Sequence, residues 1–315
     1  NYLMSDTQQT ADMLMKAFIK TMAESTLTDK DESNPLEIDL IISGGAFNGA
    51  YAFGVILYLL ELVSQKKLIV KNISGCSVGA LGALCVACNN LDPIYGLWSK
   101  LKQDFRDNQT LEPIKEIIKE CIDECMKDDD ISTLEDRLFI TKTDVKSGQH
   151  IIKSKWQSKD ELHEDLISSC FLPYIVDGNP RYKDQYIDGI NPHIFKNTTR
   201  KCIYIDLHSI YKNRWVKCFF TSCEKNPDQR ILEGVNECCR FLNGESSYLC
   251  SWLHKWNILS YTLFRLQFII IYTIVIILEN LNKFNMPDIV KQNILYKGVS
   301  STLLKLVQDS FFLGQ

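Results

Sequence analysis

The sequence predicts an α/β fold, with a mostly parallel central sheet flanked by helices. Two observations carry this prediction. A hydrophobic run at 37–42 is followed by a glycine-rich loop and a helical segment at 50–62, and the same order recurs with a short run at 68–73 and a helical segment at 78–88. Repeated strand, loop and helix units indicate parallel strands, because such strands need a long crossover that is usually a helix.

Composition sets the limits on size and function class. The chain has 315 residues, a net charge of −4 and 45% hydrophobic residues, which suits one large domain with an accessory region. The net negative charge argues against nucleic-acid binding. The sequence also lacks a run of basic residues that would favour electrostatic docking on a membrane. The five histidines have no metal-ligand spacing, so we expect neither a metal nor another cofactor.

The twelve cysteines lie along core-like segments instead of forming a small, dense scaffold. We therefore expect reduced thiols and a cytoplasmic or other reducing compartment. Cys85 and Cys88 have no partner pair at zinc spacing, so the expected role is core packing. The polar N-terminus lacks the apolar run of a signal peptide, and we expect no secretory leader.

The loop after the first strand is Ser43-Gly44-Gly45-Ala46-Phe47-Asn48-Gly49. Gly44 and Gly45 can turn their amides outward at little steric cost, which is the geometry that an oxyanion needs. A dinucleotide-binding loop has a different glycine spacing and an acidic residue farther on. A Walker loop ends in Lys, whereas Gly49 is followed by Ala50. The nucleotide interpretations are therefore weak.

The loop after the second strand, Gly75-Cys76-Ser77-Val78-Gly79, fits the Gly-x-Ser-x-Gly nucleophile elbow. Side chains two places on either side of the serine would collide in so tight a turn, which accounts for Gly75 and Gly79. Ser77 then lies at a helix N-terminus, where unpaired amides favour negative charge. We predict that Ser77 is a nucleophile.

The segment between this turn and residue 188 is expected to hold a helical insertion around 100–160. An amphipathic helix is predicted at 112–126, and 144–156 has the composition of strands. The helix ends in three aspartates at 128–130. They lack the glycine and the spaced oxygens of a calcium loop, so we expect a solvated helix end.

Asp188 follows the strand-like Tyr186-Ile187 and precedes Gly189. A single Asp-Gly is usually only a turn, but here it is the third of three blocks in a fixed order. Together with the run at 168–173, these blocks make residues 38–200 resemble the patatin-like phospholipases. The blocks of that family are Gly-Gly-Gly-x-Arg/Lys-Gly, Gly-x-Ser-x-Gly and Asp-Gly-Gly/Ala.

The resemblance implies a three-layer patatin-like fold with additional C-terminal helices. It also implies a lipid acyl hydrolase of the phospholipase A type, which cleaves phospholipid esters at a membrane surface through an acyl-enzyme. Its Ser-Asp dyad, without histidine, falls on Ser77 and Asp188. The family's oxyanion positions fall on Gly44, Gly45 and Ala46, and its supporting motif positions fall on Asn48, Gly49, Gly75, Gly79 and Gly189.

Three departures from the family pattern leave alternatives open. Ala46 replaces a glycine, Asn48 replaces Arg or Lys, and Ile190 stands where a small residue is usual. They motivate an alternative in which the chain is a catalytically inactive, membrane-associated scaffold. A second alternative is an α/β-hydrolase with a Ser-Asp-His triad, whose imidazole would come from one of three residues: His193, His208 and His254.

Domain boundaries are expected near 35 and 210. Residues 1–35 are predicted to be an amphipathic helix and an acidic linker, 36–210 the catalytic domain, and 211–315 a mainly helical region that completes or caps it. The uncharged run at 266–278 is shorter than the roughly 20 residues that cross a bilayer. We therefore favour a buried or interfacial helix, with peripheral membrane association, over an anchor at about 256–278.

A further amphipathic helix is predicted at 289–312. A homo-oligomer and an activating partner are both compatible with the sequence.

Overall fold

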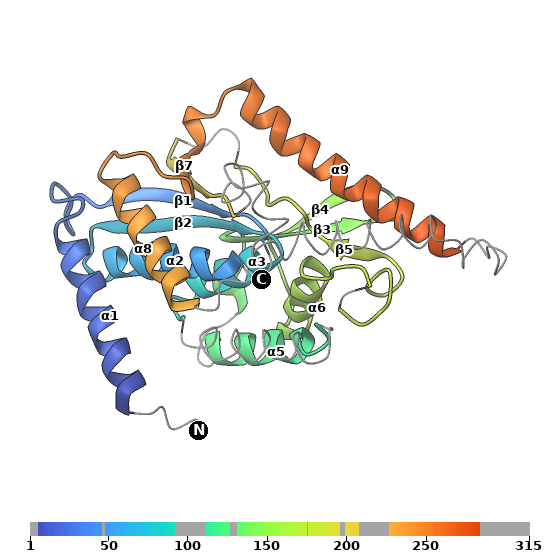
Figure 1. The fold of residues 1–315 in the computed structure, drawn as a ribbon, viewed down its shortest axis with the longest axis horizontal. Coiled ribbons are helices and arrows are strands. Elements are labelled where there is room, and N and C mark those ends of the chain that lie inside the picture. Colours follow the sequence, from blue (N-terminus) through green and yellow to red (C-terminus); the bar gives the residue numbers. More distant parts are fainter. Residues whose placement is uncertain are drawn as a thin grey trace.

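A computed structural model describes residues 6–45, 48–91, 111–126, 131–174, 176–195, 199–207 and 227–283. Their helices and strands form three layers, with one sheet between a larger group of helices and a single long helix (Figure 1). This confirms the expected three-layer α/β fold. The helix predicted at 289–312 and the aspartates at 128–130 lie outside the described residues.

The described strands form one seven-stranded sheet in the order β4-β3-β2-β1-β6-β7, with β5 also paired to β3. The pairs β1–β2, β1–β6 and β2–β3 are parallel, and β4, β5 and β7 add antiparallel pairs at the margins. The strands are β1 (Leu36–Ile42), β2 (Leu68–Gly75), β3 (Leu138–Asp144), β4 (Gln149–Lys153), β5 (Tyr186–Asp188), β6 (Lys201–Ile205) and β7 (Cys250–Trp252).

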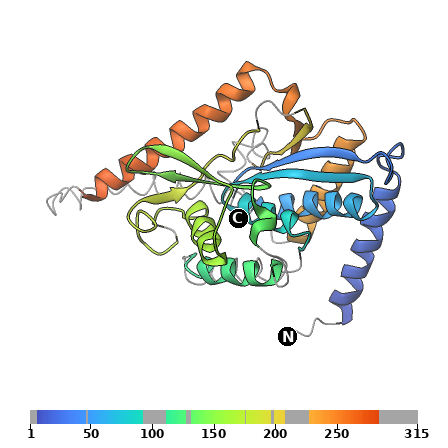
Figure 2. The same ribbon diagram turned by 180° about the vertical axis from the view of Figure 1, so that it is seen from behind.

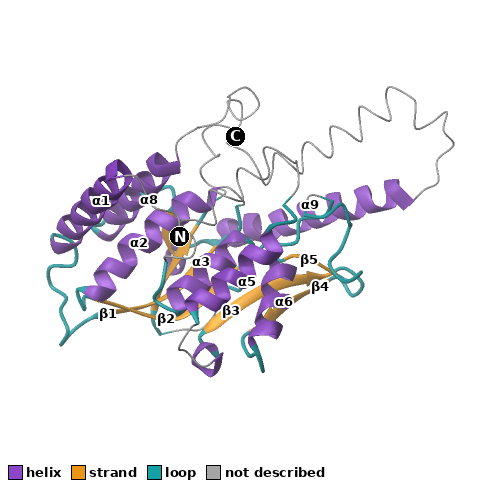
Figure 3. Cartoon of the chain, turned by 90° about the horizontal axis from the view of Figure 1, so that it is seen from below, coloured by secondary structure: helices purple, strands orange, loops and turns teal. Residues whose placement is uncertain are grey.

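One face of the sheet is covered by several helices. Figure 3 shows α1 and α8 next to α2 at one end, and α6 beside β3 and β4 at the other. The helices on this face are α1 (Asp6–Glu24), α2 (Gly49–Ser64), α3 (Val78–Ala87), α5 (Ile114–Cys125), α6 (Lys159–Ser169) and α8 (Pro227–Leu242).

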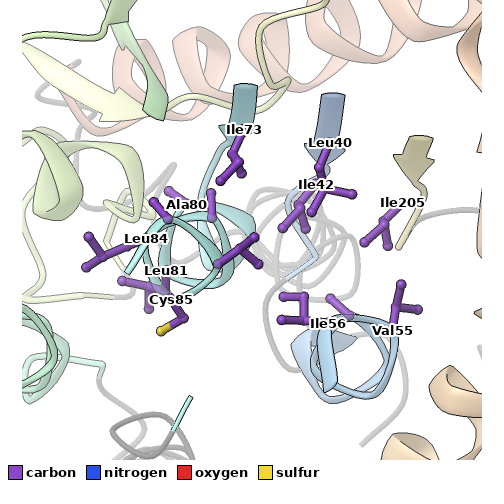
Figure 4. Packing of buried hydrophobic residues seen from close by; sticks show 14 of the residues in the cluster. Leu40, Ile42, Val55, Ile56, Ile73, Ala80, Leu81, Leu84, Cys85 and Ile205 are labelled. Carbon is purple, nitrogen blue, oxygen red and sulfur yellow. The ribbon is translucent and has the colours of Figure 1, made fainter. Parts of the chain in front are cut away.

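The main core lies between this face and α2 and α3. Figure 4 shows Ile42 of β1 and Ile73 of β2 directed toward Ile56 of α2 and Ala80 of α3. All four side chains are almost fully buried. Burying an aliphatic side chain of the size of Ile contributes about 1.5 to 3 kcal/mol, so this contact fixes the two helices on the strands that precede them.

The opposite face is covered by α9 (Ile258–Lys283), which Figures 1 and 2 show running diagonally across the sheet. Ile41 and Tyr204 point toward this face, where Phe264 packs against them. Successive side chains of a strand point to opposite faces, so the neighbours Ile41 and Ile42 belong to different layers. No helix within the described residues has the length and apolar character needed to cross a membrane.

The expected helical insertion around 100–160 is only partly helical. Its predicted helix is present as α5, and β4 lies within the segment 144–156 that was predicted to contribute strands, whereas β3 was not predicted. Charged residues in β3 interrupt the hydrophobic run that marks a buried strand. The structure accounts for one of them, because the buried Lys142 forms an ion pair with Asp165 of α6.

Candidate active site

Two of the predicted loops meet at the carboxyl ends of adjacent parallel strands. β1 ends at Ile42 and β2 ends at Gly75, and these two residues are paired in the sheet. The loops that follow parallel strands therefore start side by side. A methyl group added to Gly44 would lie 3.1 Å from Cβ of Ser77, so the glycine loop packs directly against the serine turn.

Ser77 occupies a strained turn at the N-terminus of α3. Its backbone angles are φ 53° and ψ −135°, a region that residues with a side chain rarely adopt. The Ser77 N–H donates to Oγ of Ser169 at 3.0 Å, which ties the turn to the end of α6. A Cβ added to Gly79 would lie 2.5 Å from the backbone oxygens of Ile42 and Ser43. Only glycine allows this close approach of α3 to β1.

Asp188 ends β5 and is fully buried beside this turn. Its Oδ1 accepts the N–H of Ile190 at 2.7 Å. Burial raises the pKa of Asp188 to about 7, although hydrogen bonding from the Ser77 side chain and from the Ile190 N–H lowers it. Its Oδ2 is buried and makes no close hydrogen bond within the described part of the chain. A buried carboxyl group next to a serine hydroxyl is suited to accept that hydroxyl's proton.

Cys76 connects three parts of the site. The Gly44 N–H donates to its Sγ at 3.1 Å, and its thiol donates to the carbonyl of Ile190 at 3.4 Å. Burial, followed by the charge of Asp188, raises the pKa of Cys76 well above its ordinary value, so the thiol keeps its proton and can donate. The amide of Gly44, one of three predicted oxyanion donors, is therefore already engaged.

A backbone hydrogen bond also joins two described residues of the glycine loop. The Asn48 N–H donates to the carbonyl of Gly45 at 2.9 Å and closes a turn just before α2. Asn48 is buried, and Gly49 begins the helix. This backbone turn accounts for part of the shape of the loop at the position where the family has Arg or Lys. Ala46 lies outside the described residues.

Ile190 adopts a conformation that explains why a small residue is usual at its position. Its φ is 61°, which is a strained value for a β-branched residue. The Asn191 N–H donates to the carbonyl of Gly189 at 2.6 Å, so Ile190 is the centre of a tight three-residue turn. A Cβ on Gly189 would lie 2.3 Å from the carbonyl oxygen of Thr141, which requires glycine there.

The structure also brings to this turn a residue that sequence reasoning missed. The imidazole Nε2 of His150 on β4 lies 3.0 Å from the carbonyl oxygen of Gly189 and 2.8 Å from that of Asn191. No motif marks His150. Its only signal is the sheet register, which places it opposite Thr143, the residue that Ile187 of β5 also faces.

The histidines of the triad alternative occupy other environments. His193 stacks on Phe139 at 5.5 Å between ring centroids, and His254 is tilted against Trp252 at 5.9 Å. His208 lies outside the described residues. The described partners of the Asp188 carboxyl are Ser77 and Ile190, with no imidazole among them. The described residues also contain no group of three or more His, Cys, Asp or Glu side chains placed to hold a metal ion.

Comparison with known protein families finds a match for about half of the chain. Residues 40–192 match the family model described as patatin-like phospholipase, and this range contains the glycine loop, the serine turn and Asp188.

Curated relatives match about half of the chain. The 1-acylglycerol-3-phosphate O-acyltransferase Pnpla3 of Mus musculus is 30% identical over 159 residues, which cover 48% of this chain and 38% of the relative. The omega-hydroxyceramide transacylases of Mus musculus and Homo sapiens are 28% and 26% identical, over 47% of this chain and 26% and 29% of their own lengths. The matched region thus spans less than two fifths of each relative.

Proposed function

We propose that this chain, in which residues 40–192 are a patatin-like phospholipase domain, is a lipid acyl hydrolase of the phospholipase A type. The observation that carries the proposal is the pairing of Ser77, on its strained turn, with the buried carboxyl of Asp188. A serine hydroxyl is a weak nucleophile until a base accepts its proton. A carboxyl with a pKa of about 7 is a far better base at neutral pH than an exposed aspartate.

The proposed reaction has two halves. Asp188 takes the proton of the Ser77 hydroxyl while Oγ attacks the ester carbonyl of the lipid, which gives a tetrahedral intermediate. Collapse of this intermediate breaks the ester bond, and the leaving alcohol takes the proton from Asp188. Water then attacks the acyl-enzyme with Asp188 again acting as base, and the fatty acid leaves as Ser77 regains its proton.

The negatively charged oxygen of the tetrahedral intermediate needs hydrogen-bond donors to stabilise it. We assign this role to the amides of Gly45 and Ala46, which stand at two of the oxyanion positions of the family's motif. The Gly44 amide instead donates to Cys76 and holds the loop against the serine turn. Ser77 also lies directly before the first turn of α3, where the helix dipole favours negative charge. A single oxyanion donor is typically worth about 3 to 4 kcal/mol of transition-state stabilisation.

Contact with a lipid surface through α9 is a second part of the proposal. The inner side of α9 packs on the sheet, and its Phe264 carbonyl accepts the Asn191 side-chain amide at 2.7 Å, so the helix adjoins the turn that follows Asp188. Its outer side carries large apolar side chains at helical spacing, and an exposed stripe of this kind suits a lipid interface. The stripe consists of Leu259, Leu263, Leu266, Ile270 and Ile277.

Acyl transfer to an alcohol is the second candidate function. Ser77 and Asp188 are 4% and 2% exposed, and a site that excludes water favours another acceptor for the acyl group. The relatives named above are an acyltransferase and two transacylases. Incubating the protein with phospholipid vesicles and a lysophosphatidic acid acceptor distinguishes the two functions, because transfer gives a new diacyl lipid where hydrolysis gives free fatty acid.

The dyad is tested with a fluorophosphonate probe and with acyl release from mixed phospholipid vesicles. The wild type should be labelled and active, whereas Ser77→Ala should lose both properties and Asp188→Asn should lose most activity. Ser74→Ala is a matched control, because Ser74 is buried on β2 and its hydroxyl has no hydrogen-bond partner in the described structure. Persistent labelling of Ser77→Ala would refute the assignment of Ser77 as the nucleophile. A wild type that neither releases nor transfers acyl groups would favour the scaffold.

A further inference from the structure

We infer that His150 is a positioning residue, whose imidazole N–H holds the turn at Ile190 and thereby orients the carboxyl group of Asp188. Its catalytic meaning rests on the proposed function, whereas its effect on the turn does not. The Nε2 of His150 lies within hydrogen-bonding distance of the two carbonyl groups on either side of Ile190, at 3.0 and 2.8 Å.

The sheet carries His150 to this position. His150 on β4 and Ile187 on β5 are both paired with Thr143 of the intervening β3. Directly paired residues project to the same face of a sheet, so the imidazole reaches across β3 toward the chain that follows β5. Thr141, two residues earlier on β3, projects to this face as well and donates its hydroxyl to the carbonyl of Asn191 at 2.8 Å.

The proton on the imidazole follows from the chemistry of its partners. Both partners are carbonyl oxygens, which only accept hydrogen bonds, so Nε2 carries the hydrogen. Burial lowers the pKa of His150, while the contacts with Asn191 and Gly189 raise it. Nε2 donates in the neutral and in the charged form alike, so the support of the turn does not depend on the charge of the ring.

The turn needs support from outside. Ile190 has a positive φ, and its neighbours are joined by a 2.6 Å hydrogen bond across a three-residue turn, a conformation that an isolated chain rarely adopts. The two flanking carbonyls converge on one donor. Without His150, the carbonyl of Gly189 loses this hydrogen bond, and among the described residues Thr141 remains as the side-chain donor to the carbonyl of Asn191.

A hydrogen bond connects the turn at Ile190 to the carboxyl group of Asp188. The Ile190 N–H donates to Oδ1 of Asp188 at 2.7 Å, so a displacement of the turn displaces this donor and rotates the carboxyl relative to Ser77. Misplacement of a reacting group by about 1 Å can cost about 100-fold in rate. We expect the loss in kcat, because His150 acts on the position of the Asp188 carboxyl through its contacts with the turn.

The test compares His150→Phe, which keeps the ring but has no donor, with His150→Gln, whose amide N–H can replace the imidazole N–H. The matched control is His163→Phe, because Nε2 of His163 also contacts a backbone carbonyl, that of Lys115 at 2.8 Å, at the contact between α6 and α5. Two readouts are needed: kcat and KM for ester release, and hydrogen exchange of the amides in the peptide 186–195. Should His150→Phe fail to fold, His150→Leu takes its place.

We expect His150→Phe to lower kcat by about 10- to 100-fold with little change in KM, and to speed exchange within 186–195 only. His150→Gln should recover most of both, and His163→Phe should change neither. Unchanged exchange in His150→Phe, or a Gln variant no better than the Phe variant, overturns the inference. Faster exchange in a protein whose wild type shows no acyl chemistry refutes the proposed function but supports His150 as the residue that holds the turn.

Discussion

Asp188 lies directly opposite Lys142 in the antiparallel pairing of β5 with β3, yet the ammonium group of Lys142 contacts a different carboxylate. Its Nζ lies 2.5 Å from Oδ1 of Asp165 on α6 and 4.0 Å from the centroid of the Tyr186 ring. Trp156 donates its indole N–H to the second oxygen of Asp165 at 2.8 Å. Asp165 thus neutralises the nearby cation, and burial dominates the pKa of Asp188.

Removing one member of the Lys142–Asp165 pair should cost more stability than removing both. Both side chains are buried, and an unpartnered charge in such a site typically costs about 3 to 5 kcal/mol, whereas an apolar replacement of the whole pair is often nearly neutral. We expect Asp165→Asn to lower the free energy of unfolding by about 3 kcal/mol, and Lys142→Met combined with Asp165→Leu to recover most of it. Urea titrations measure both. A double variant as unstable as the single one would contradict this account.

The rate of ester cleavage should rise with pH through about 7. The proposed base works as the carboxylate, and the pKa of Asp188 is about 7, so kcat/KM at pH 6 should be about tenfold below its plateau. The nearby thiols Cys76 and Cys170 have pKa values raised well above the ordinary one by burial, so they do not titrate in this range. A profile that stays flat from pH 5 to 8 would exclude Asp188 as the base.

Asp188→Asn should stabilise the protein at alkaline pH while it removes activity. The pKa of Asp188 is higher in the folded chain than its ordinary value of 3.8, so the folded state binds the proton more tightly and loses stability as pH rises from about 4 to 7. Three pKa units correspond to about 4 kcal/mol. We expect the variant to match the wild type near pH 4 and to exceed it by up to that amount at pH 8, as measured by urea titrations.

Alanine at Gly44 and at Gly79 should have different effects. At Gly79 the added methyl would lie 2.5 Å from two backbone oxygens, so α3 must move away from β1, and we expect a loss of at least about 2 kcal/mol of stability. At Gly44 the nearest atom is Cβ of Ser77 at 3.1 Å, which can shift by a few tenths of an ångström.

The Gly44→Ala variant should therefore fold normally but cleave esters more slowly, by about tenfold or more. Thermal unfolding and activity, measured on both variants, check the contrast. Equal stability of the two variants would show that the close approach of α3 to β1 is not required.

Charges on the outer side of α9 should weaken binding to liposomes. Leu263 and Ile270 are 50% and 56% exposed, and transfer of such a side chain into an apolar phase is worth about 1.5 to 3 kcal/mol. We expect Leu263→Glu combined with Ile270→Glu to lower the fraction that sediments with phosphatidylcholine vesicles by tenfold or more. Leu14→Glu on α1 is the control, since Leu14 is 67% exposed on another helix. An equal loss in both would point to a general effect of charge.

Local patterns in the sequence predicted the elements around the serine turn. The strand at 68–73 and the helix at 78–88 were predicted from composition and periodicity, and β2 and α3 confirm them. The strand around 138–144 escaped prediction, because Lys142 and Asp144 break its hydrophobic pattern. A charged residue in a sequence indicates an exposed position unless its buried partner is known. The partner of Lys142 is Asp165, which lies 23 residues away, so no local pattern reveals the pair.

The amino-acid sequence by itself determined the chemistry that is available at the site. The order of the glycine loop, the serine turn and the Asp-Gly step identified the family, because each depends on residues close together in the chain. Only the tertiary structure decided which groups surround Ser77 and Asp188. Two contacts show this: the hydrogen bond from Gly44 to Cys76, and the contact of the His150 imidazole with the turn at Ile190. Both depend on sheet register and on the packing of distant segments, which no local pattern encodes.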